Sequence, residues 1–496
     1  MDPCIVETKY GAVKGECRDG VYIWRGIPYA AAPEGENRFR APLPPNSWEG
    51  VRNAVEFGPS CPQGGRSRRR SVIRDMSEDC LSLNIWSPGK STKKPVFFYI
   101  HGGTFIEGAG SDAEYEGTKL AGNGDIILIT VNYRMGVLGF MDFSFLGEDF
   151  LPNCGLRDLA LALRWVYENI EAFGGDKDNI TVGGQSAGAS CAVTLTMFDD
   201  VRPYIKRVIM MSGVPTLLFT REESQKIAKM YLKYMDIDNA ESLKAVSAMS
   251  LASRQSEFAG HTRLGAAAFG ICVDGELVKQ FLIPAASEGK MSGISMLFGT
   301  TREEMSFALK KSLAHIVDIE TVRKAGNAAE SDEVKMQIYK TYERYGKRGE
   351  AIMFSDFSFR LPAMWFAEVQ SKYADTWMYR FDYETIGMRI TDLHAFHSCD
   401  VPFLFGNFKT GLAKYMVILS PVKIGIQKVY HEFQGDLFAF IKTGELPWEK
   451  CKGKDAPAKC YTLRSHVEQA VPDDVKEAYE ATEYRRRSFS GNSIEL

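Results

Sequence analysis

One serine in a glycine-rich pentapeptide has the surroundings of a nucleophile. Gly184-Gln185-Ser186-Ala187-Gly188 has the pattern Gly-x-Ser-x-Gly, which can hold a serine hydroxyl in the open for attack on a carbonyl carbon. The apolar run 180–182 precedes it and a helical stretch follows, so we predict a turn between a strand and a helix. An ordinary glycine-rich turn is the alternative, because a chain with 45 glycines can contain this pattern by chance.

A serine that attacks a carbonyl needs fixed donors for the oxygen that becomes negative. One donor is expected from the backbone N–H of Ala187, the residue after the serine. A second glycine-rich turn, His101-Gly102-Gly103-Thr104-Phe105, follows the apolar run 97–100, and its small residues allow the backbone to approach a substrate. We therefore predict an oxyanion hole formed by Gly103, Thr104 and Ala187, with Gly102 and Gln185 flanking it.

The serine also needs a base to take its proton. In folds built around such a turn the chain order is nucleophile, acid, histidine, so the base must follow Ser186. His397 is the best candidate because it lies in a segment with loop character, whereas His431 lies within helical periodicity. His394 and His397 form a His-x-x-His pair, but no third metal ligand is evident in the sequence.

The acid of such a triad should follow a strand that lies between the serine and the histidine in sequence. Gly299-Thr300-Thr301-Arg302-Glu303-Glu304 comes directly after the apolar run 294–298, at the carboxyl end of a predicted strand. Position alone does not separate Glu303 from Glu304. Either carboxylate could instead cap a following helix, because acidic residues are favoured in a first helical turn.

These residues require a scaffold that brings the ends of several strands together. Strand-like apolar runs alternate with helical periodicity, which is clearest over 156–173, and this predicts an α/β fold with a largely parallel sheet covered on both faces. The runs are 96–101, 126–133, 180–184, 208–212, 294–299 and 377–381. Stretches of about 220–290 and 303–373 have helical spacing and are expected to be insertions. Without repeats or linkers, we predict one domain over residues 1–496.

The combination of these segments resembles the type-B carboxylesterases, a family that contains the cholinesterases and the bacterial p-nitrobenzyl esterases. The resemblance extends from about residue 5 to residue 450. It implies an α/β-hydrolase fold with helical insertions over the active site, and hydrolysis of carboxylic esters through an acyl-enzyme intermediate. The matching stretches are Gly26-Ile27-Pro28-Tyr29, Arg38-Phe39-Arg40, Glu78-Asp79-Cys80-Leu81, Val131-Asn132-Tyr133-Arg134, Phe173-Gly174-Gly175-Asp176 and Pro402-Phe403-Leu404-Phe405-Gly406.

The resemblance also bears on individual residues. The family's Gly-x-x-x-x-Glu motif places the acid on Glu304, and counting back from Phe405-Gly406 places the histidine on His397. The family disulfide would correspond to Cys61 and Cys80, which we expect to be at least partly reduced in a reducing cytoplasm.

Three departures from the family pattern mark this chain. The residue before the nucleophile is often Glu in the family and is Gln185 here. The third small residue of the oxyanion turn is usually Gly or Ala and is Thr104 here. The loop from Cys61 to Cys80 has no Trp, although cholinesterases use a Trp there to bind quaternary ammonium, so choline esters are poor candidate substrates.

Composition narrows the partners and the location. A net charge of -3 and a pI near 6.3 argue against nucleic-acid binding. The N-terminus has no basic stretch leading into an apolar run, and no apolar run is long enough to span a bilayer. The sequence therefore predicts a cytoplasmic protein, most like the bacterial esterases. Ten cysteines without Cys-x-x-Cys pairs give no reason to expect a metal, and we expect no cofactor.

Two kinds of alternative function stay open at this point. The same triad could hydrolyse amides, carbamates or long-chain lipid esters, because the sequence does not place the pockets that select a small-molecule ester. A non-catalytic binding protein is the alternative from another class, although Ser186, Glu304 and His397 are all retained. The oligomeric state is not predicted.

Overall fold

One mixed sheet runs through the computed structural model, which describes residues 2–64, 75–89, 93–262, 268–307, 330–411, 413–418 and 423–490. The strands from β15 to β8 in sheet order are parallel, and antiparallel strands extend both edges. In sheet order the strands are β16 (His466–Gln469), β15 (Pro457–Tyr461), β14 (Thr376–Phe381), β13 (Ser295–Thr301), β10 (Ile205–Met211), β9 (Gly175–Gln185), β7 (Lys94–Ile100), β8 (Ile127–Val131), β6 (Ser82–Ser87), β4 (Val21–Pro28) and β3 (Glu16–Arg18).

Each strand-like run in the sequence corresponds to a strand of this sheet, within a few residues at its ends. Alternate residues of β7 show why the run is apolar throughout. Phe98 and Ile100 belong to the core on one face of the sheet, while Phe97 and Tyr99 belong to the core on the other. The predicted parallel sheet with two covered faces is confirmed. Because such a strand is buried on both sides, its residues are apolar throughout instead of alternating apolar and polar.

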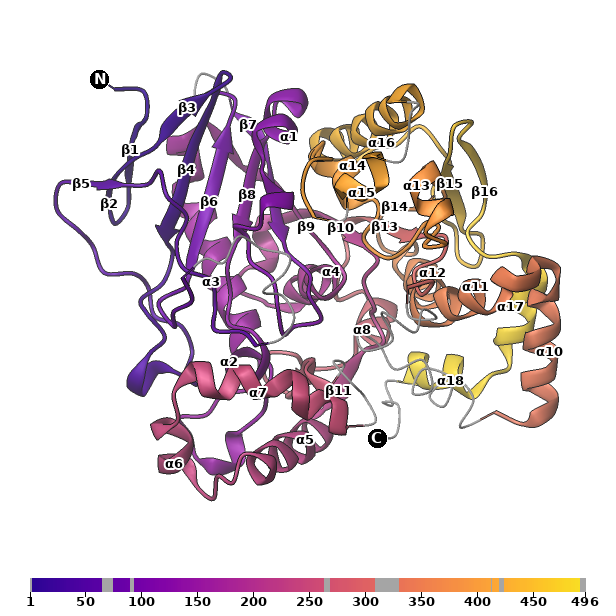
Figure 1. Cartoon of the computed structure of the whole chain (residues 1–496), viewed down its shortest axis with the longest axis horizontal. Coiled ribbons are helices and arrows are strands. Elements are labelled where there is room, and N and C mark those ends of the chain that lie inside the picture. The colour runs from indigo at the N-terminus through magenta and orange to yellow at the C-terminus, as the bar shows by residue number, and fades with distance from the viewer. Residues whose placement is uncertain are drawn as a thin grey trace.

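Helices cover the two faces of the sheet (Figure 1). On one face pack α3, whose 3-10 extension η5 (Ile170–Phe173) completes the predicted 156–173 helix, and α4, α8 and α12. On the other face pack α1, α14 and α16. Their bounds are α1 (Thr118–Gly124), α3 (Cys154–Asn169), α4 (Ala187–Thr194), α8 (Leu282–Ser287), α12 (Leu361–Gln370), α14 (Val401–Phe405) and α16 (Lys423–Thr443).

The two predicted insertions are mostly helical where the structure describes them. The first also contains strand β12 (Ile271–Val273), which pairs in parallel with β11 (Leu218–Thr220) and is too short to give a periodic signal in the sequence. Parts of both insertions, 263–267 and 308–329, lie outside the described residues. The helices are α5 (Arg221–Tyr234), α6 (Ala240–Ala245), α7 (Ala248–His261), α10 (Asp332–Tyr342) and α11 (Gly349–Ser355).

The remaining elements complete the periphery. A small sheet of β1, β2 and β5 lies beside the N-terminal edge, and α17 packs against α10 (Figure 1). These elements are β1 (Ile5–Thr8), β2 (Gly11–Lys14), β5 (Val51–Asn53), α2 (Gly136–Gly139), α13 (Ile386–Ile390), α15 (Ala413–Ile418), α17 (Asp473–Glu480) and α18 (Glu483–Ser490).

Candidate active site

Adjacent strands end side by side and carry the predicted site residues. The strands β14, β13, β10, β9 and β7 are neighbours and parallel, so their carboxyl ends share one edge of the sheet, where α/β proteins bind their ligands. Met211, the last residue of β10, pairs with both Gln185 and Gly299. This register puts the residues after β9 and β13 on either side of those after β10.

Ser186 lies in the turn between β9 and α4, where the sequence predicted it. Its φ of 57° and ψ of -124° form a backbone conformation that costs free energy for an L-residue. Its N–H donates to the carbonyl oxygen of Met211 at 2.9 Å. A Cβ on Gly184 would lie 2.5 Å from the Ile100 carbonyl oxygen, and one on Gly188 would collide with the same carbonyl. Both glycines are therefore needed for this turn to pack against the end of β7.

The glycine-rich turn after β7 lies directly against the serine. A Cβ on Gly102 would lie 2.6 Å from the backbone carbonyl oxygen of Gln185 and 3.2 Å from the Cβ of Ser186, so glycine allows this close approach. Gly103 and Thr104 follow with φ values of 118° and 56°. The left-handed conformation is ordinary for Gly103 but strained for Thr104.

His101 fixes the start of this turn, a role that the sequence alone did not reveal. Burial lowers the pKa of His101 to about 4, so its ring is neutral at neutral pH. Its Nδ1 lies 2.8 Å from the carbonyl oxygen of Gly102, and because a carbonyl only accepts, Nδ1 is the donor. The ring stacks on Tyr133 with centroids 4.6 Å apart. Holding the Gly102 carbonyl toward His101 turns the N–H of Gly103 the opposite way, since the peptide is planar and trans.

Glu304 and His397, far apart in sequence, are hydrogen-bonded to each other. Nδ1 of His397 lies 2.6 Å from Oε2 of Glu304, and the backbone N–H of His397 donates to the carbonyl oxygen of Glu304 at 3.3 Å. Glu304 is 0% exposed. Because a carboxylate accepts, Nδ1 carries the proton of the neutral ring, and Nε2 keeps the lone pair that a general base needs.

Ser212 completes the hydrogen bonding of Glu304. Its hydroxyl donates to Oε1 of Glu304 at 2.7 Å, and the N–H of Thr301 donates to the same oxygen at 2.7 Å. Sequence reasoning did not select Ser212. A signal was present, however, because Ser212 directly follows a strand that lies between the strands leading to Ser186 and Glu304.

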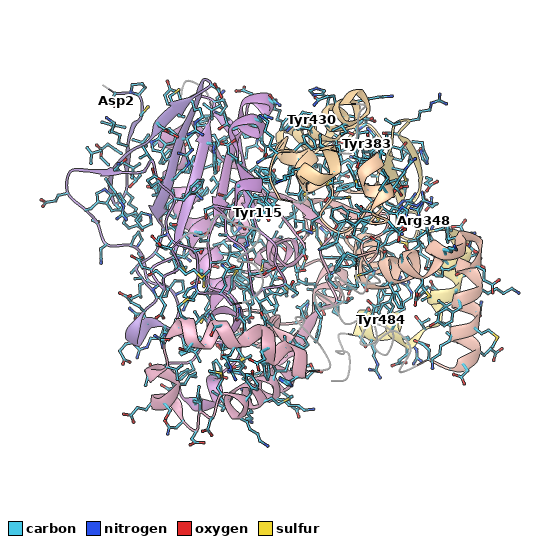
Figure 2. The ribbon with its side chains drawn as sticks, in the orientation of Figure 1. Asp2, Tyr115, Arg348, Tyr383, Tyr430 and Tyr484 are labelled. Carbon is cyan, nitrogen blue, oxygen red and sulfur yellow. The ribbon has the colours of Figure 1, made fainter. Side chains whose placement is uncertain are left out.

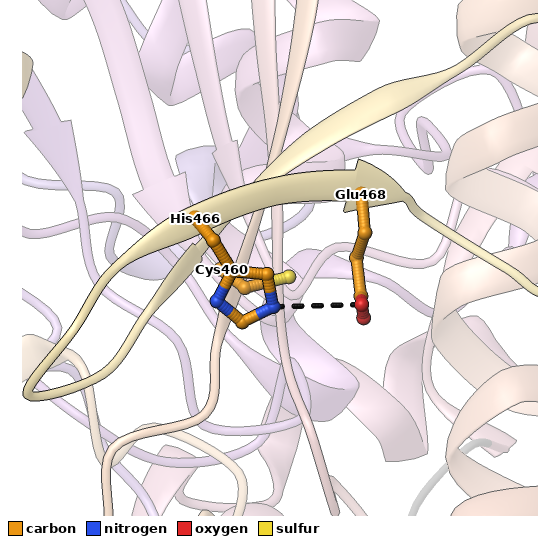
Figure 3. Close-up of side chains that lie close together, drawn as sticks. All are labelled: Cys460, His466 and Glu468. Atoms are coloured by element: carbon orange, nitrogen blue, oxygen red, sulfur yellow. Dashed lines mark ion pairs between the residues drawn. The ribbon is translucent and has the colours of Figure 1, made fainter.

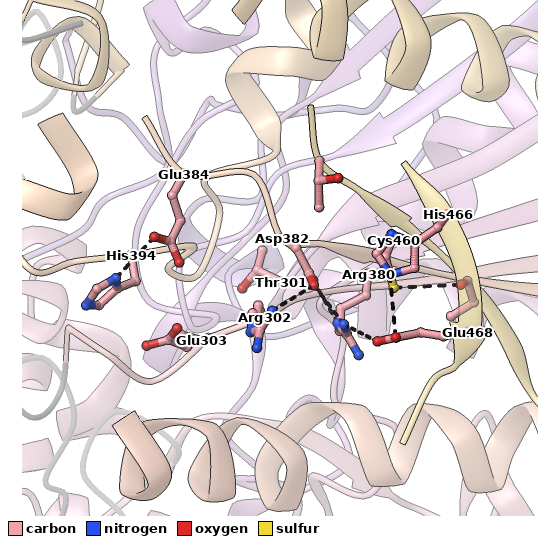
Figure 4. A network of polar contacts seen from close by, with 12 residues as sticks. Thr301, Arg302, Glu303, Arg380, Asp382, Glu384, His394, Cys460, His466 and Glu468 are labelled. Carbon is pink, nitrogen blue, oxygen red and sulfur yellow. Dashed lines mark hydrogen bonds and ion pairs between the residues drawn. The ribbon is translucent and has the colours of Figure 1, made fainter. Parts of the chain in front are cut away.

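The neighbouring acid, Glu303, lies in a different cluster. Its carboxylate forms an ion pair with Arg348, and Arg348 also contacts Glu384 at 2.6 Å. Nδ1 of His394 lies 3.3 Å from the same Glu384. Although burial opposes it, the charge of Arg348 lowers the pKa of Glu384. We call Glu303, Arg348, Glu384 and His394 the arginine cluster; Figure 2 labels Arg348 beside α10 and α11, and Figure 4 shows the three other members.

Gln185 contacts the histidine rather than only flanking the serine. Its side-chain Nε2 lies 3.0 Å from Nε2 of His397, and Gln185 is 4% exposed. The described residues show no hydrogen bond from the Ser186 hydroxyl to His397. The structure therefore brings Glu304, His397 and Gln185 into direct contact, next to a serine whose hydroxyl is not bonded to the base.

An aromatic ring also covers the histidine. Phe359 lies with its ring centroid 4.9 Å from that of His397. It belongs to a short π-helix, η10 (Asp356–Arg360), between α11 and α12. Such bulges often occur at functional sites. Sequence reasoning missed Phe359, because a one-turn π-helix within a helical stretch leaves no distinct periodicity.

The cysteines of the resemblance-based disulfide are close together but unbonded. Cys61 and Cys80 are both buried free thiols. The neighbouring Cys61 thiol and burial raise the pKa of Cys80 well above its usual value. Residues 65–74 of the loop between them, where cholinesterases carry their Trp, lie outside the described residues.

Two groups of side chains in the described residues have metal-ligand chemistry. One is Cys460, His466 and Glu468 on the β15–β16 hairpin (Figure 3). There Arg380 already binds Glu468 at 2.6 Å, and burial raises the pKa of the Cys460 thiol to about 12, which disfavours the thiolate that metals bind. The other comprises Glu303, Glu384 and His394, so His394 does have acidic neighbours that the sequence did not reveal. The carboxylates of Glu303 and Glu384 in this second group already form ion pairs with Arg348.

Comparisons with known proteins show which family and fold the chain shares. The family model described as "Carboxylesterase family" matches residues 2–449. The para-nitrobenzyl esterase of Bacillus subtilis (strain 168) is 37% identical over 448 residues, covering 89% of this chain and 90% of that protein. The phenmedipham hydrolase of Pseudarthrobacter oxydans is 30% identical over 473 residues, covering 89% of this chain and 90% of that protein. A solved structure titled PNB esterase superposes with a TM-score of 0.87 at 33% identity, covering 96% of this chain and 99% of that one.

No helix in the described ranges is both long and apolar enough to cross a bilayer. The predicted α/β-hydrolase fold and the predicted relationship to the p-nitrobenzyl esterases are confirmed by the structural and sequence matches. The chain belongs to the carboxylesterase family.

Proposed function

We propose that this protein is a serine carboxylesterase in which Ser186 is the nucleophile, His397 the general base and Glu304 the residue that orients the base. The observation that carries this proposal is the 2.6 Å hydrogen bond between Glu304 and Nδ1 of His397, formed beside the strained serine turn. It leaves Nε2 as the basic atom of the ring, and this atom contacts Gln185, the residue before the nucleophile.

The reaction follows in two steps. The oxygen of Ser186 bonds to the ester carbonyl carbon while its proton passes to Nε2 of His397, and backbone N–H groups of Gly103, Thr104 and Ala187 bind the negative oxygen. When the carbonyl re-forms, the bond to the alcohol breaks and the alcohol takes the proton from Nε2. Water then attacks the acyl-serine in the same way, with His397 accepting its proton and returning a proton to Ser186.

Removing the serine hydroxyl tests this proposal. For Ser186→Ala, kcat on p-nitrophenyl acetate should fall by roughly three or more orders of magnitude, the scale for losing a triad member. Ser144→Ala is the matched control, because the Ser144 hydroxyl bonds only α5 side chains in the described residues and lies outside the site. A Ser186→Ala enzyme that keeps most of its activity would remove Ser186 from the mechanism.

The class of ester that the protein hydrolyses can be determined with a panel of substrates. A panel of esters, amides and carbamates with graded acyl and alcohol lengths distinguishes a small-ester hydrolase from the alternatives with the same triad. We also propose that residues 1–496 form one domain, supported by a sheet that joins β3 to β16. A cytoplasmic location stays a prediction from the sequence.

A further inference from the structure

The amide of Gln185 is hydrogen-bonded to Nε2 of His397, the nitrogen that catalysis needs as a base. Nδ1 of His397 donates to Glu304, so in the neutral ring Nε2 is an acceptor. The Gln185 side-chain nitrogen, 3.0 Å away, must therefore be the donor. An amide in the opposite orientation would set two acceptors against each other. The proton of Ser186 needs this same lone pair.

The absence of a side chain at Gly102 leaves room for this amide. A Cβ on Gly102 would lie 2.6 Å from Oε1 of Gln185, so any other residue at 102 would press on the amide. Exchanging the NH2 group and the oxygen of the buried Gln185 requires only a rotation about the terminal side-chain bond, a torsion with broad minima. The same side chain can present a donor to neutral imidazole and an acceptor to imidazolium.

We propose that Gln185 is a positioning residue whose hydrogen bond to Nε2 holds His397 in its neutral, resting form. We call this hydrogen bond the latch. The amide must break this bond or turn when Nε2 takes the serine proton. This inference rests on the proposed function of His397. In the resting form the donor stabilises the unprotonated ring. In the tetrahedral intermediate Nε2 carries a proton, and of the two ends of the Gln185 amide only the oxygen can then accept a hydrogen bond from it.

The proposal predicts how activity depends on pH. A donor facing Nε2 stabilises the unprotonated ring and an acceptor stabilises the protonated one, so substitutions at position 185 should move the acidic limb of kcat/KM. Gln185→Met removes the donor and should move that limb to higher pH. Gln185→Glu, which can only accept, should move it further, by about one pH unit or more.

The other charged groups near His397 are the same in every variant, and because Asp400 itself titrates near pH 6, the acidic limbs are compared between variants. Among the described residues these charged groups are Glu304, Asp400 in the loop after His397, and Arg360 of η10, which is paired with Asp356 and interacts electrostatically with Glu304. Gln225→Glu is the charge-matched control, because Gln225 on α5 bonds Ser144 outside the site. Each variant is first compared with the wild type in Tm to show that it folds.

The test measures kcat/KM on p-nitrophenyl acetate against pH, together with the rate at which diethyl p-nitrophenyl phosphate inactivates each variant. The expected order of the acidic limb is wild type, then Gln185→Met, then Gln185→Glu, with Gln225→Glu at the wild-type position. Coincident limbs in variants that are active would overturn the latch. A wild type that is inactive and gains no phosphoryl group on Ser186 would instead overturn the proposed function.

Discussion

Two acid–histidine clusters lie next to each other at this edge of the sheet, and they differ in how their charge is balanced. Glu304 meets His397, the hydroxyl of Ser212 and the N–H of Thr301. Glu303, one residue earlier, meets Arg348, which also binds the acid beside His394. Adjacent residues on one turn thus face opposite surroundings.

The difference shows which cluster can act on a proton. In the arginine cluster a permanent cation neutralises Glu303, so its carboxylate has little charge left to support a protonated histidine. Around Glu304 the hydrogen-bonding groups are neutral or are the histidine itself, so the carboxylate can stabilise an imidazolium that forms during reaction.

The largest expected effect is on catalysis by Glu304. Glu304→Gln should lower kcat on p-nitrophenyl acetate by roughly three to four orders of magnitude, because an amide cannot stabilise the imidazolium and can favour the wrong tautomer. Glu303→Gln, the same change one residue away, should alter kcat by less than about tenfold. Similar losses in the two variants would contradict the contrast.

Much of this site could be predicted from the sequence, and the rest could not for definable reasons. Ser186 and Glu304 follow strands, so the order of elements placed them at one edge. Glu303 and Glu304 could not be separated by position, because the distinction depends on Arg348, which is distant in sequence and reaches the turn only in the fold. Gln185, Ser212 and Phe359 are ordinary residue types whose roles arise from contacts across strands and from a π-helix.

The next effect concerns stability in the arginine cluster. Arg348→Met should destabilise the protein by about 2 kcal/mol, because it leaves the buried Glu303 carboxylate without its cation. The loss should be smaller than for a fully buried ion pair, because Arg348 is partly exposed. Denaturant unfolding measures the change, and kcat should stay within about tenfold. Adding Glu303→Gln to Arg348→Met should recover most of the loss. A collapse of kcat without a loss of stability would show that this cluster acts in catalysis.

The negative charge of Glu304 acts on a second buried carboxylate, Asp400. Burial, followed by that negative charge, raises the pKa of Asp400 to about 6 from 3.8. A raised pKa means that the stability contribution is full below about pH 4 and is lost as pH rises through about 6. Asp400→Asn, which can still accept from the Tyr379 hydroxyl, should therefore be more stable than the wild type at pH 8, by about 2 kcal/mol. The difference in Tm should shrink toward pH 5; a difference independent of pH would contradict it.

The smallest effect is expected at the second histidine. His394 contacts Glu384 and Asp392 at 3.3 and 3.0 Å, both away from the Glu304–His397 pair. His394→Gln should change kcat by less than about threefold, or about 0.7 kcal/mol, whereas His397→Gln should remove activity on the scale of Ser186→Ala. A large loss for His394→Gln would place the arginine cluster within the mechanism.

The most direct test of the central claim is covalent labelling by diethyl p-nitrophenyl phosphate, followed by mass spectrometry of the peptides. The account predicts one diethylphosphoryl group per chain, on Ser186, with release of p-nitrophenolate. The rate of labelling should fall by roughly three orders of magnitude or more in Glu304→Gln and in His397→Gln, and little in Glu303→Gln and His394→Gln. An adduct on another residue, or equal labelling rates in all four variants, would contradict a serine activated by the Glu304–His397 pair.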